Sequence, residues 1–297
     1  MISTSTPKPK VGFIGLGMMG RHMAGHLLQA GYELHINSRT QSSGLPLVEA
    51  GALWHDHPGA VAAACEVLLT IVGYPSDVES IYLEDGGILD SARPGTIVID
   101  MTTSSPALAE RIASAAAQRG ILALDAPVSG GDVGARNAKL AIMVGGDETA
   151  FDRALPLFQL MGSNIVRMGG PGSGQHTKMA NQVAIASTMI AVAESISYAK
   201  RAGLDPNLAL SVIGTGAASG FLLNELGRRM IRDDFTAGFF VHHFVKDMTI
   251  AMEEAARMKL DLPGLALAKS LYEKLVDGGY GEDGTQALYR IYNALHQ

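Results

Sequence analysis

The sequence predicts an α/β fold in which a Rossmann-type doubly wound parallel sheet is followed by an all-α domain. Three observations lead to it: short apolar runs alternate with alanine-rich, helix-compatible segments, the first run ends in a glycine-rich turn, and strand-like runs stop near residue 170. Parallel strands need crossover connections, so this alternation indicates helices on both faces of the sheet. The Gly-Pro-rich patch at 169–174 predicts domains at 1–170 and 171–297.

Five apolar runs in the first half have the length of buried strands. They cover residues 10–14, 33–37, 67–72, 96–100 and 122–125, and two further extended candidates lie at 137–145 and 165–167. After the first run, apolar residues recur at helical spacing from Met19 to Ala30, where Gly31 stops the helix. From residue 175 the pattern is helical almost to the end, beginning with a long helix that Gly203 closes.

Composition and charge exclude several classes of partner. The net charge is −6 and the 23 Lys and Arg residues are scattered, so we expect no nucleic-acid partner. A single cysteine, Cys65, excludes an intramolecular disulfide, and a cytoplasmic location is expected. Residues 183–193 are too short an apolar stretch to predict a membrane span. The adjacent residues His55-Asp56-His57 cannot all converge on one ion, so no metal site is expected.

The glycine-rich turn after the first strand predicts a dinucleotide site. Its first glycine ends the strand, Gly17 lets the backbone approach a pyrophosphate, and Gly20 lets the following helix pack closely on the sheet. The N-terminus of that helix then faces the anion. A tight turn without a ligand is the alternative. The predicted cofactor-binding residues of the turn are Gly15, Leu16, Gly17, Met18, Met19 and Gly20.

The end of the second predicted strand indicates which dinucleotide is bound. The motif usually has an acidic residue about 20 positions on, which binds the adenine ribose. Here the chain instead reads Ser38-Arg39-Thr40, which offers a planar cation and two hydroxyls to a 2′-phosphate. We therefore expect a preference for NADP, with NAD still possible because nothing repels it. The alternative interpretation is that Arg39 is a surface arginine in a polar loop with no role in cofactor binding.

Four ordered motifs beyond the glycine turn resemble those of the β-hydroxyacid dehydrogenase family, which includes 3-hydroxyisobutyrate dehydrogenase and tartronate semialdehyde reductase. They are Asp100-Met101-Thr102-Thr103 with Pro106, Asp125-Ala126-Pro127-Val128-Ser129-Gly130-Gly131, Gly172-Ser173-Gly174-Gln175 with Lys178 and Asn181, and Lys246-Asp247-Met248. The resemblance covers nearly the whole chain. It implies an NAD(P)-dependent oxidoreductase that transfers a hydride between a nicotinamide and a small 3-hydroxy acid or its semialdehyde.

The resemblance also implies roles for the matched residues. A loop rich in backbone N–H groups would bind the substrate carboxylate, and Lys178 would be the catalytic acid–base group. A partly desolvated lysine can supply the proton that carbonyl reduction needs. The implied substrate-binding residues are Ser129, Gly130, Gly131, Asn181 and Gln182, and the further implied cofactor-binding residues are Thr102 and Lys246 and, more weakly, Tyr74 and Pro75.

Two points stay open at the level of residues. Lys178, Asn181 and Gln182 share one helix face, but many family members carry a second Asn in place of Gln182, so which amide touches the substrate is undecided. Ala138 replaces a glycine that is usual in the family, which we expect to affect only a turn.

Other functions remain as alternatives. Loss of the lysine at position 178 would indicate a dinucleotide-binding scaffold or sensor without catalysis. Lys178 is present in this chain. A tartronate semialdehyde, succinic semialdehyde or glyoxylate reductase is the alternative enzyme, and the same scaffold could reduce imines. The absence of a Lys and Arg cluster argues against phosphorylated substrates such as 6-phosphogluconate. Apolar faces of the later helices predict a homodimer or homotetramer formed through the helical domain.

Overall fold

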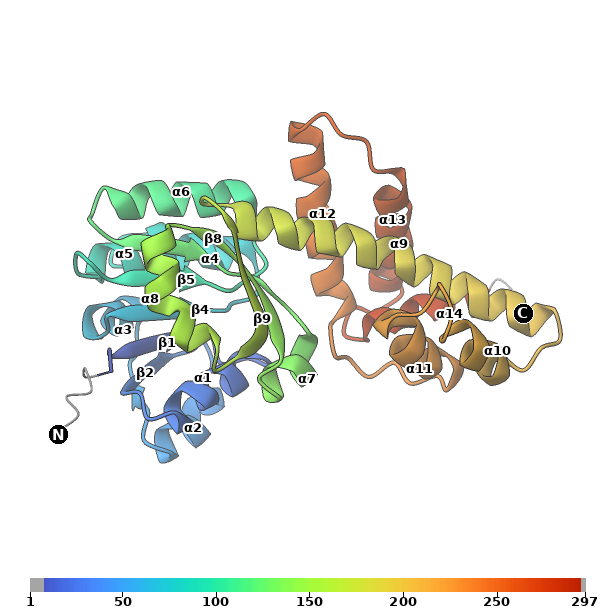
Figure 1. The fold of residues 1–297 in the computed structure, drawn as a ribbon, viewed down its shortest axis with the longest axis horizontal. Coiled ribbons are helices and arrows are strands. Elements are labelled where there is room, and N and C mark those ends of the chain that lie inside the picture. The colour runs from blue at the N-terminus through green and yellow to red at the C-terminus, as the bar shows by residue number, and fades with distance from the viewer. Residues whose placement is uncertain (1–7, 295–297) are drawn as a thin grey trace. The chain divides into compact units, whose positions relative to one another are not determined.

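The computed structural model describes residues 8–294, and the chain separates into two compact units, residues 1–178 and 179–297. The first unit is built on one nine-stranded sheet in the order β3-β2-β1-β4-β5-β6-β8-β7, with β9 paired to β8 (Figure 1). Its strands are β1 Val11–Ile14, β2 Leu34–Asn37, β3 Leu53–Trp54, β4 Val67–Thr70, β5 Ile97–Asp100, β6 Leu122–Asp125, β7 Val128–Ser129, β8 Leu140–Gly146 and β9 Gly162–Gly169.

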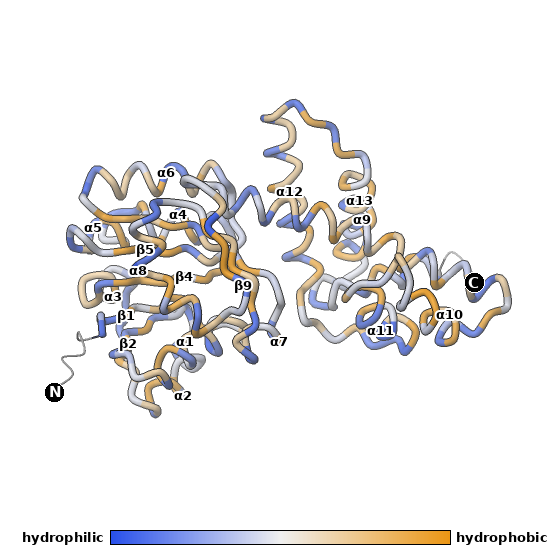
Figure 2. Tube along the Cα trace, viewed as in Figure 1, coloured by the Kyte–Doolittle hydropathy of each residue, from blue (hydrophilic) through white to orange (hydrophobic). Residues whose placement is uncertain are grey.

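Helices cover both faces of this sheet, which is why its strands are apolar on both sides. Alternate strand residues enter two separate cores: Phe13 packs with one set of helices, and Ile14 packs with the other. Figure 2 shows the resulting continuous apolar run along β4, at the centre of the sheet. The first core includes α1 Gly20–Gln29, α2 Leu45–Glu49, α7 Gly131–Arg136 and α8 Glu148–Phe158, and the second includes α3 Pro58–Ala64, α4 Pro75–Leu83, α5 Ile88–Ser91 and α6 Pro106–Ala117.

The sheet is mostly parallel, which confirms the predicted doubly wound fold, and the direction of β8 is a detail that the sequence did not predict. β1 to β6 are parallel throughout, but β8 runs antiparallel to both β6 and β7. Apolar patterning reveals that a segment is a buried strand, but it does not encode the direction in which that strand pairs. The two-residue strands β3 and β7 also escaped prediction, because they are shorter than any periodic signal.

The turn before β8 carries the Ala138 substitution noted in the sequence. Ala138 has a φ of 53°, in the left-handed region where a residue with a Cβ is strained. The glycine usual at this position in the resembled family would adopt this conformation without strain. The turn keeps its shape with alanine, at a cost on the order of 1 kcal/mol.

The second unit is helical apart from an isolated bridge between Phe240 and Gly284. One core gathers apolar residues from most of its helices, including Phe244 and Tyr272, whose rings meet edge to face at 5.0 Å. Its elements, in the described range, are the end of α9 Ser173–Arg201, then α10 Pro206–Ile213, the π-helical turn η2 Leu222–Gly227, α11 Arg228–Ile231, α12 Val241–Arg257, α13 Pro263–Asp277, the short η3 Thr285–Leu288 and α14 Tyr289–Ala294.

Helix α9 is longer than the apolar stretch recognised in the sequence. Its 29 residues run from the last turn of the first unit into the second, and Gly203 follows with a φ of 73°. By length and composition alone α9 could cross a membrane, which corrects the expectation that the stretch is too short. A buried core helix passes the same test, and 44% of its most apolar window is buried within the protein.

Candidate functional site

The glycine-rich turn between β1 and α1 is shaped to admit an anion. A Cβ at Gly15 would lie 2.1 Å from the carbonyl oxygen of Ile71, and one at Gly20 would lie 1.9 Å from that of Gly15. A Cβ at Gly17 would meet nothing within 4 Å, so the backbone there is open to a ligand. Among the described residues no side chain caps α1. The N–H groups of Arg21 and His22 donate to the carbonyl oxygens of Gly17 and Met19, so an anion would meet the backbone of the turn that precedes them. The turn therefore fits the pyrophosphate of a dinucleotide.

The remaining predicted residues of this turn contribute through their backbone. The Leu16 side chain is buried in the core, whereas its N–H donates to Ser38 Oγ at 3.3 Å. Met18 is half-buried, and Met19 is the N-cap residue of α1. Ser38, predicted as a cofactor residue, thus also holds the turn against the end of β2.

The end of β2 presents a cation where many dinucleotide sites present an acid. The side chain of Asn37 is buried and donates to the carbonyl oxygen of His55 at 2.8 Å, so it serves the sheet. Arg39 and Thr40 come next and are both exposed. The Arg39 guanidinium is therefore accessible to a ligand bound at the edge of this unit.

Thr102 is buried just after β5 and links two loops. Its N–H donates to Asp100 Oδ1 at 3.1 Å, and its Oγ1 accepts from the N–H of Val72 at 2.9 Å. The second bond fixes the loop after β4, which leads through Tyr74, the N-cap residue of α4, to Pro75 at its first position. The structure therefore connects Thr102 to the loop that carries Tyr74 and Pro75.

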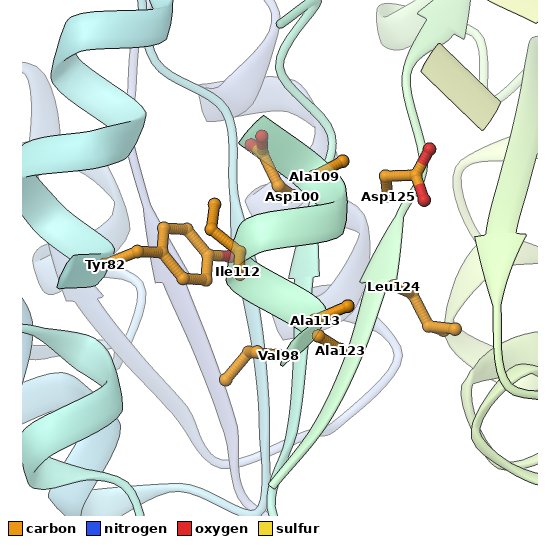
Figure 3. Close-up of a pocket in the computed structure, with 9 residues that line it drawn as sticks. All are labelled: Tyr82, Val98, Asp100, Ala109, Ile112, Ala113, Ala123, Leu124 and Asp125. Carbon is orange, nitrogen blue, oxygen red and sulfur yellow. The ribbon is translucent and has the colours of Figure 1, made fainter. Parts of the chain in front are cut away.

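Two buried carboxylates lie side by side at the carboxyl ends of β5 and β6. Asp100 and Asp125 are register partners, and Figure 3 shows both beside α6. Thr70 Oγ1 lies 3.0 Å from Asp100 Oδ1 and 3.0 Å from the Tyr82 hydroxyl oxygen. A small cavity adjoins both carboxylates, and its lining residues are Tyr82, Val98, Asp100, Ala109, Ile112, Ala113, Ala123, Leu124 and Asp125.

Burial governs the protonation of this pair. It raises the pKa of Asp100 to about 6, although hydrogen bonds from Thr102 and Thr70 lower it and the charge of Asp125 raises it further. Burial also raises the pKa of Asp125 to about 6, against the lowering effect of backbone hydrogen bonds, chiefly from Gln175 and Gly172. The folded protein therefore holds protons on these carboxylates more tightly than the unfolded chain does.

The carboxylate of Asp125 fixes the start of α9. Its Oδ1 accepts from the N–H of Gly172 at 2.8 Å, and its Oδ2 accepts from the N–H of Gln175 at 2.8 Å. The same turn packs directly on the sheet backbone, because a Cβ at Gly174 would lie 2.4 Å from the carbonyl oxygen of Met143. Charge-assisted bonds of this kind are stronger than those between neutral groups. The first turn of α9 is thus held by β6 and β8.

The predicted carboxylate-binding loop follows β7. Ser129 pairs with Ala141 of β8, and Gly130 is the N-cap residue of α7. Gly130 and Gly131 have φ values of 129° and 61°, which residues with a Cβ rarely adopt. Successive glycines in such conformations can turn their N–H groups toward one anion. The local geometry suits the predicted role.

Lys178 lies on α9 one turn after the anchored Gln175. Only 7% of Lys178 is exposed. Asn181 is half-buried, and its Nδ2 donates to Gln182 Oε1 at 2.8 Å. The Nε2 of Gln182 in turn donates to Asp247 Oδ2 at 2.6 Å. Both ends of the Gln182 amide are therefore used within the protein, and Asn181 is the more accessible of the two amides.

Two further buried polar residues lie in the motifs quoted from the sequence, where no role was given to them. Asp247 is buried and links Gln182 to Lys246, whose Nζ lies 3.1 Å from Asp247 Oδ1. Gln175 is buried and precedes Lys178 and Gln182 by three and seven residues, a helical spacing that could have revealed it. Within residues 8–294 no group of three or more His, Cys, Asp or Glu side chains could hold a metal ion.

Comparison with known families assigns both parts of the chain. Residues 10–170 match the NAD-binding domain of 6-phosphogluconate dehydrogenase, and residues 172–292 match the NAD-binding domain of NADP-dependent 3-hydroxyisobutyrate dehydrogenase. Together the two matches cover most of the described chain.

Whole-chain relatives agree with this assignment. An uncharacterised oxidoreductase, YkwC of Bacillus subtilis, is 50% identical over 96% of this chain and 99% of its own length. A probable 3-hydroxyisobutyrate dehydrogenase-like protein of Arabidopsis thaliana is 50% identical, covering 97% of this chain and 86% of its own. The 2-hydroxy-3-oxopropionate reductase of Escherichia coli is 37% identical, covering 96% of this chain and 98% of its own.

Solved structures show the same architecture. A Mycobacterium tuberculosis 3-hydroxyisobutyrate dehydrogenase, determined with L-serine, has a TM-score of 0.88 and 28% identity, covering 96% of this chain and 99% of its own. Psf3, determined with NADP+ and 2-OPP, has a TM-score of 0.86 and 25% identity, covering 95% of this chain and 99% of its own.

The buried carboxylates lead to a test of stability against pH. Because the pKa of folded Asp100 is near 6 rather than near 4, its contribution to the free energy of unfolding falls as the pH rises from about 4 to about 6. Asp100→Asn removes this titration while its amide oxygen can still accept from Thr70 and Thr102. We expect the variant to gain about 1–3 kcal/mol over wild type at pH 7.5 and little at pH 4, measured by urea unfolding without cofactor.

Asp125→Asn is the matched control. It also removes a buried charge, but its amide nitrogen would face one of the two backbone N–H donors of α9. We expect it to be less stable than Asp100→Asn by about 1–3 kcal/mol at every pH. Equal stability of the two variants across the pH range would contradict the separate roles given to the two carboxylates.

Proposed function

Because this chain belongs to the 3-hydroxyisobutyrate dehydrogenase family of NAD(P)-dependent oxidoreductases, we propose that it transfers a hydride between a nicotinamide cofactor and a small 3-hydroxy acid or its semialdehyde. The family membership rests on the matches over residues 10–170 and 172–292 and on relatives that are 50% identical over nearly the whole chain. The identity of the substrate is the part that we propose.

The burial of Lys178 on an anchored helix turn carries the proposal. A solvated surface lysine would be exposed and mobile, whereas this one is 7% exposed and follows a turn that Asp125 and Gln175 fix. Asn181, one turn further along the same face, is the amide that would orient the substrate. The backbone of Ser129, Gly130 and Gly131 would hold the carboxylate, as argued above.

The proposed reaction transfers one hydride and one proton. In the oxidising direction the C–H bond of the alcohol carbon breaks, and its electron pair leaves with the hydrogen as hydride. A nicotinamide dinucleotide held by the glycine turn would supply the hydride acceptor. The hydroxyl proton passes to the neutral amine of Lys178, and the C–O bond becomes a carbonyl. In the reducing direction the Lys178 ammonium returns the proton to the carbonyl oxygen as the new C–H bond forms.

The relatives are named for different substrates. The Arabidopsis relative is named for 3-hydroxyisobutyrate, and the E. coli relative for 2-hydroxy-3-oxopropionate, which is tartronate semialdehyde. Both compounds carry a carboxylate and a hydroxymethyl or aldehyde group on one central carbon atom, and they differ in whether that carbon also bears a methyl or a hydroxyl group. We place 3-hydroxyisobutyrate first, and tartronate semialdehyde, succinic semialdehyde or glyoxylate as the alternative substrates.

A substrate panel with Lys178 variants tests the function. Wild type should turn over at least one of these compounds with NADP or NAD, and Lys178→Met, which keeps the chain length, should lower kcat by about 100- to 10,000-fold. Lys274→Met, at an exposed lysine of α13, is the control and should keep wild-type rates. Full activity of Lys178→Met would overturn the catalytic assignment, whereas cofactor binding without any turnover would favour the scaffold alternative.

NADP is the proposed preferred cofactor, with NAD also usable. The exposed Arg39 and the hydroxyl-bearing neighbours Ser38 and Thr40 support it, as does the NADP+ bound to the similar structure of Psf3. A guanidinium that pairs with a 2′-phosphate contributes nothing to NAD, which lacks that group. The proposed preference therefore depends on one side chain.

Arg39→Ala tests the cofactor preference. We expect kcat/KM with NADP to fall by about 10- to 100-fold, since charge-assisted hydrogen bonds are lost, while kcat/KM with NAD stays within about twofold. Arg232→Ala, at an exposed arginine of the helical unit, should change neither value. An unchanged NADP-to-NAD ratio in Arg39→Ala would refute the role of this residue.

We further propose that the helical unit forms a homodimer or homotetramer. The end of α9 and the following α10 expose large apolar side chains, including Leu208 at 68% and Val212 at 73%. Exposed apolar residues gathered on two successive helices favour contact with a second copy over contact with water.

Light scattering tests the oligomer. Wild type at micromolar concentration should have the mass of two or four chains, and Leu208→Asp with Val212→Asp should shift it toward the 31.2 kDa monomer. Leu45→Asp places the same charge at an exposed apolar residue of α2 and should leave the mass unchanged. A monomeric wild type would exclude this assembly.

A further inference from the structure

The buried side chain of Gln175 joins two segments of the proposed active site. Its Nε2 donates to the carbonyl oxygen of Thr102 at 2.7 Å, and its Oε1 accepts from the N–H of Ser104 at 3.0 Å. Gln175 itself is fully buried, with 0% exposed. One amide group thus satisfies two backbone groups of the loop after β5.

The backbone of the same residue belongs to the first turn of α9. Its N–H donates to Asp125 Oδ2 at 2.8 Å, and the adjacent Gly174 packs against β6 and β8 too closely for any Cβ. Gln175 is therefore fixed at both its backbone and its side chain. A residue held in this way cannot adjust without moving either the helix turn or the loop.

The two segments that Gln175 connects carry different parts of the proposed chemistry. Lys178 follows three residues later on the same face of α9, about one helical turn away. Thr102, on the loop side, fixes the segment from Val72 to Pro75, which is expected to contact the cofactor. The distance between these two segments decides whether proton transfer and hydride transfer can occur at one substrate.

We propose that Gln175 is a positioning residue, which holds the Lys178 turn of α9 at a set distance from the Thr102 loop. This inference rests on the proposed function. Gln175 takes no part in binding the substrate or moving the proton. It keeps the acid–base group in register with the cofactor site, because its amide hydrogen-bonds directly to the backbone of the Thr102 loop.

Two variants separate this role from simple packing. Gln175→Met has a similar length but can neither donate to Thr102 nor accept from Ser104. Gln175→Glu keeps an acceptor for the Ser104 N–H, and it can donate to the Thr102 carbonyl oxygen only when protonated. The glutamate variant should therefore recover the link as the pH falls, whereas the methionine variant cannot.

The kinetic test uses the ratio of variant to wild-type kcat per folded active site, across pH. For Gln175→Met the ratio should be lowered by about 10- to 100-fold and should not change with pH. For Gln175→Glu the ratio should rise as the pH falls. The dissociation constant for NADP, measured by fluorescence, should stay within about twofold. Tyr272→Phe, which removes a buried hydrogen bond to Thr285 in the helical unit, should lower Tm and leave kcat unchanged.

Hydrogen exchange provides a measurement that needs no substrate. In Gln175→Met without cofactor, exchange should increase at the amides of residues 102–104 and of residues 175–181 together. The positioning role would be overturned if kcat were unchanged in both variants, or if the two variants' kcat ratios varied with pH in the same way. It would also be overturned if exchange increased at one segment alone. A wild type that turns over none of the panel compounds would instead refute the proposed function, and the exchange result would still decide whether Gln175 couples the two segments.

Discussion

The hydrogen bonds between the Asp125 carboxylate and the start of α9 position the candidate site residues of the first unit. Asp125 ends β6, and both of its oxygens accept backbone N–H groups from the turn at residues 172–175. A helix N-terminus has unsatisfied donors and a partial positive charge, so a buried carboxylate there is both stabilised and stabilising. The position of Lys178 follows from this contact, since the helix continues unbroken from the anchored turn.

Burial has an electrostatic cost for Asp125 and for the neighbouring carboxylate alike. Asp100 is buried beside Asp125, and the pKa of each is raised to about 6. Without the helix N-terminus, a second buried acid at this position would be hard to accommodate. Thr70 and Thr102 compensate in part by bonding to Asp100, and Thr102 also supports the loop after β4. One polar network thus links the ends of three adjacent strands to α9.

In the glycine turn and in the helical unit, too, polar contacts within the protein hold groups that remain more accessible. Ser38 supports the glycine turn at the N–H of Leu16, which leaves the exposed Arg39 beside it. In the helical unit, Asp247 holds Gln182, and Gln182 holds Asn181. The sequence left open which of these two amides would meet the substrate. Because both ends of the Gln182 amide are hydrogen-bonded within the protein, Asn181 is the one we propose.

The sequence by itself determined the two-part organisation, the doubly wound sheet, the glycine turn and the long helix. These features depend on local signals, namely the period of apolar residues, glycines with positive φ and ordered motifs, which act over a few residues each. The family resemblance supplied Lys178, Ser129 and the cofactor residues in the same way, as matches at known spacings.

Only the tertiary structure decided what depends on residues far apart in the chain. The antiparallel course of β8, the pairing of Asp100 with Asp125, and the contact of Gln175 with Thr102 join segments separated by about 20 to 70 residues. No local pattern encodes such contacts, because strand direction and side-chain partners are fixed by how the whole chain packs. The residues proposed to carry the chemistry could therefore be predicted from the sequence. The residues that hold them in place could be found only in the folded structure.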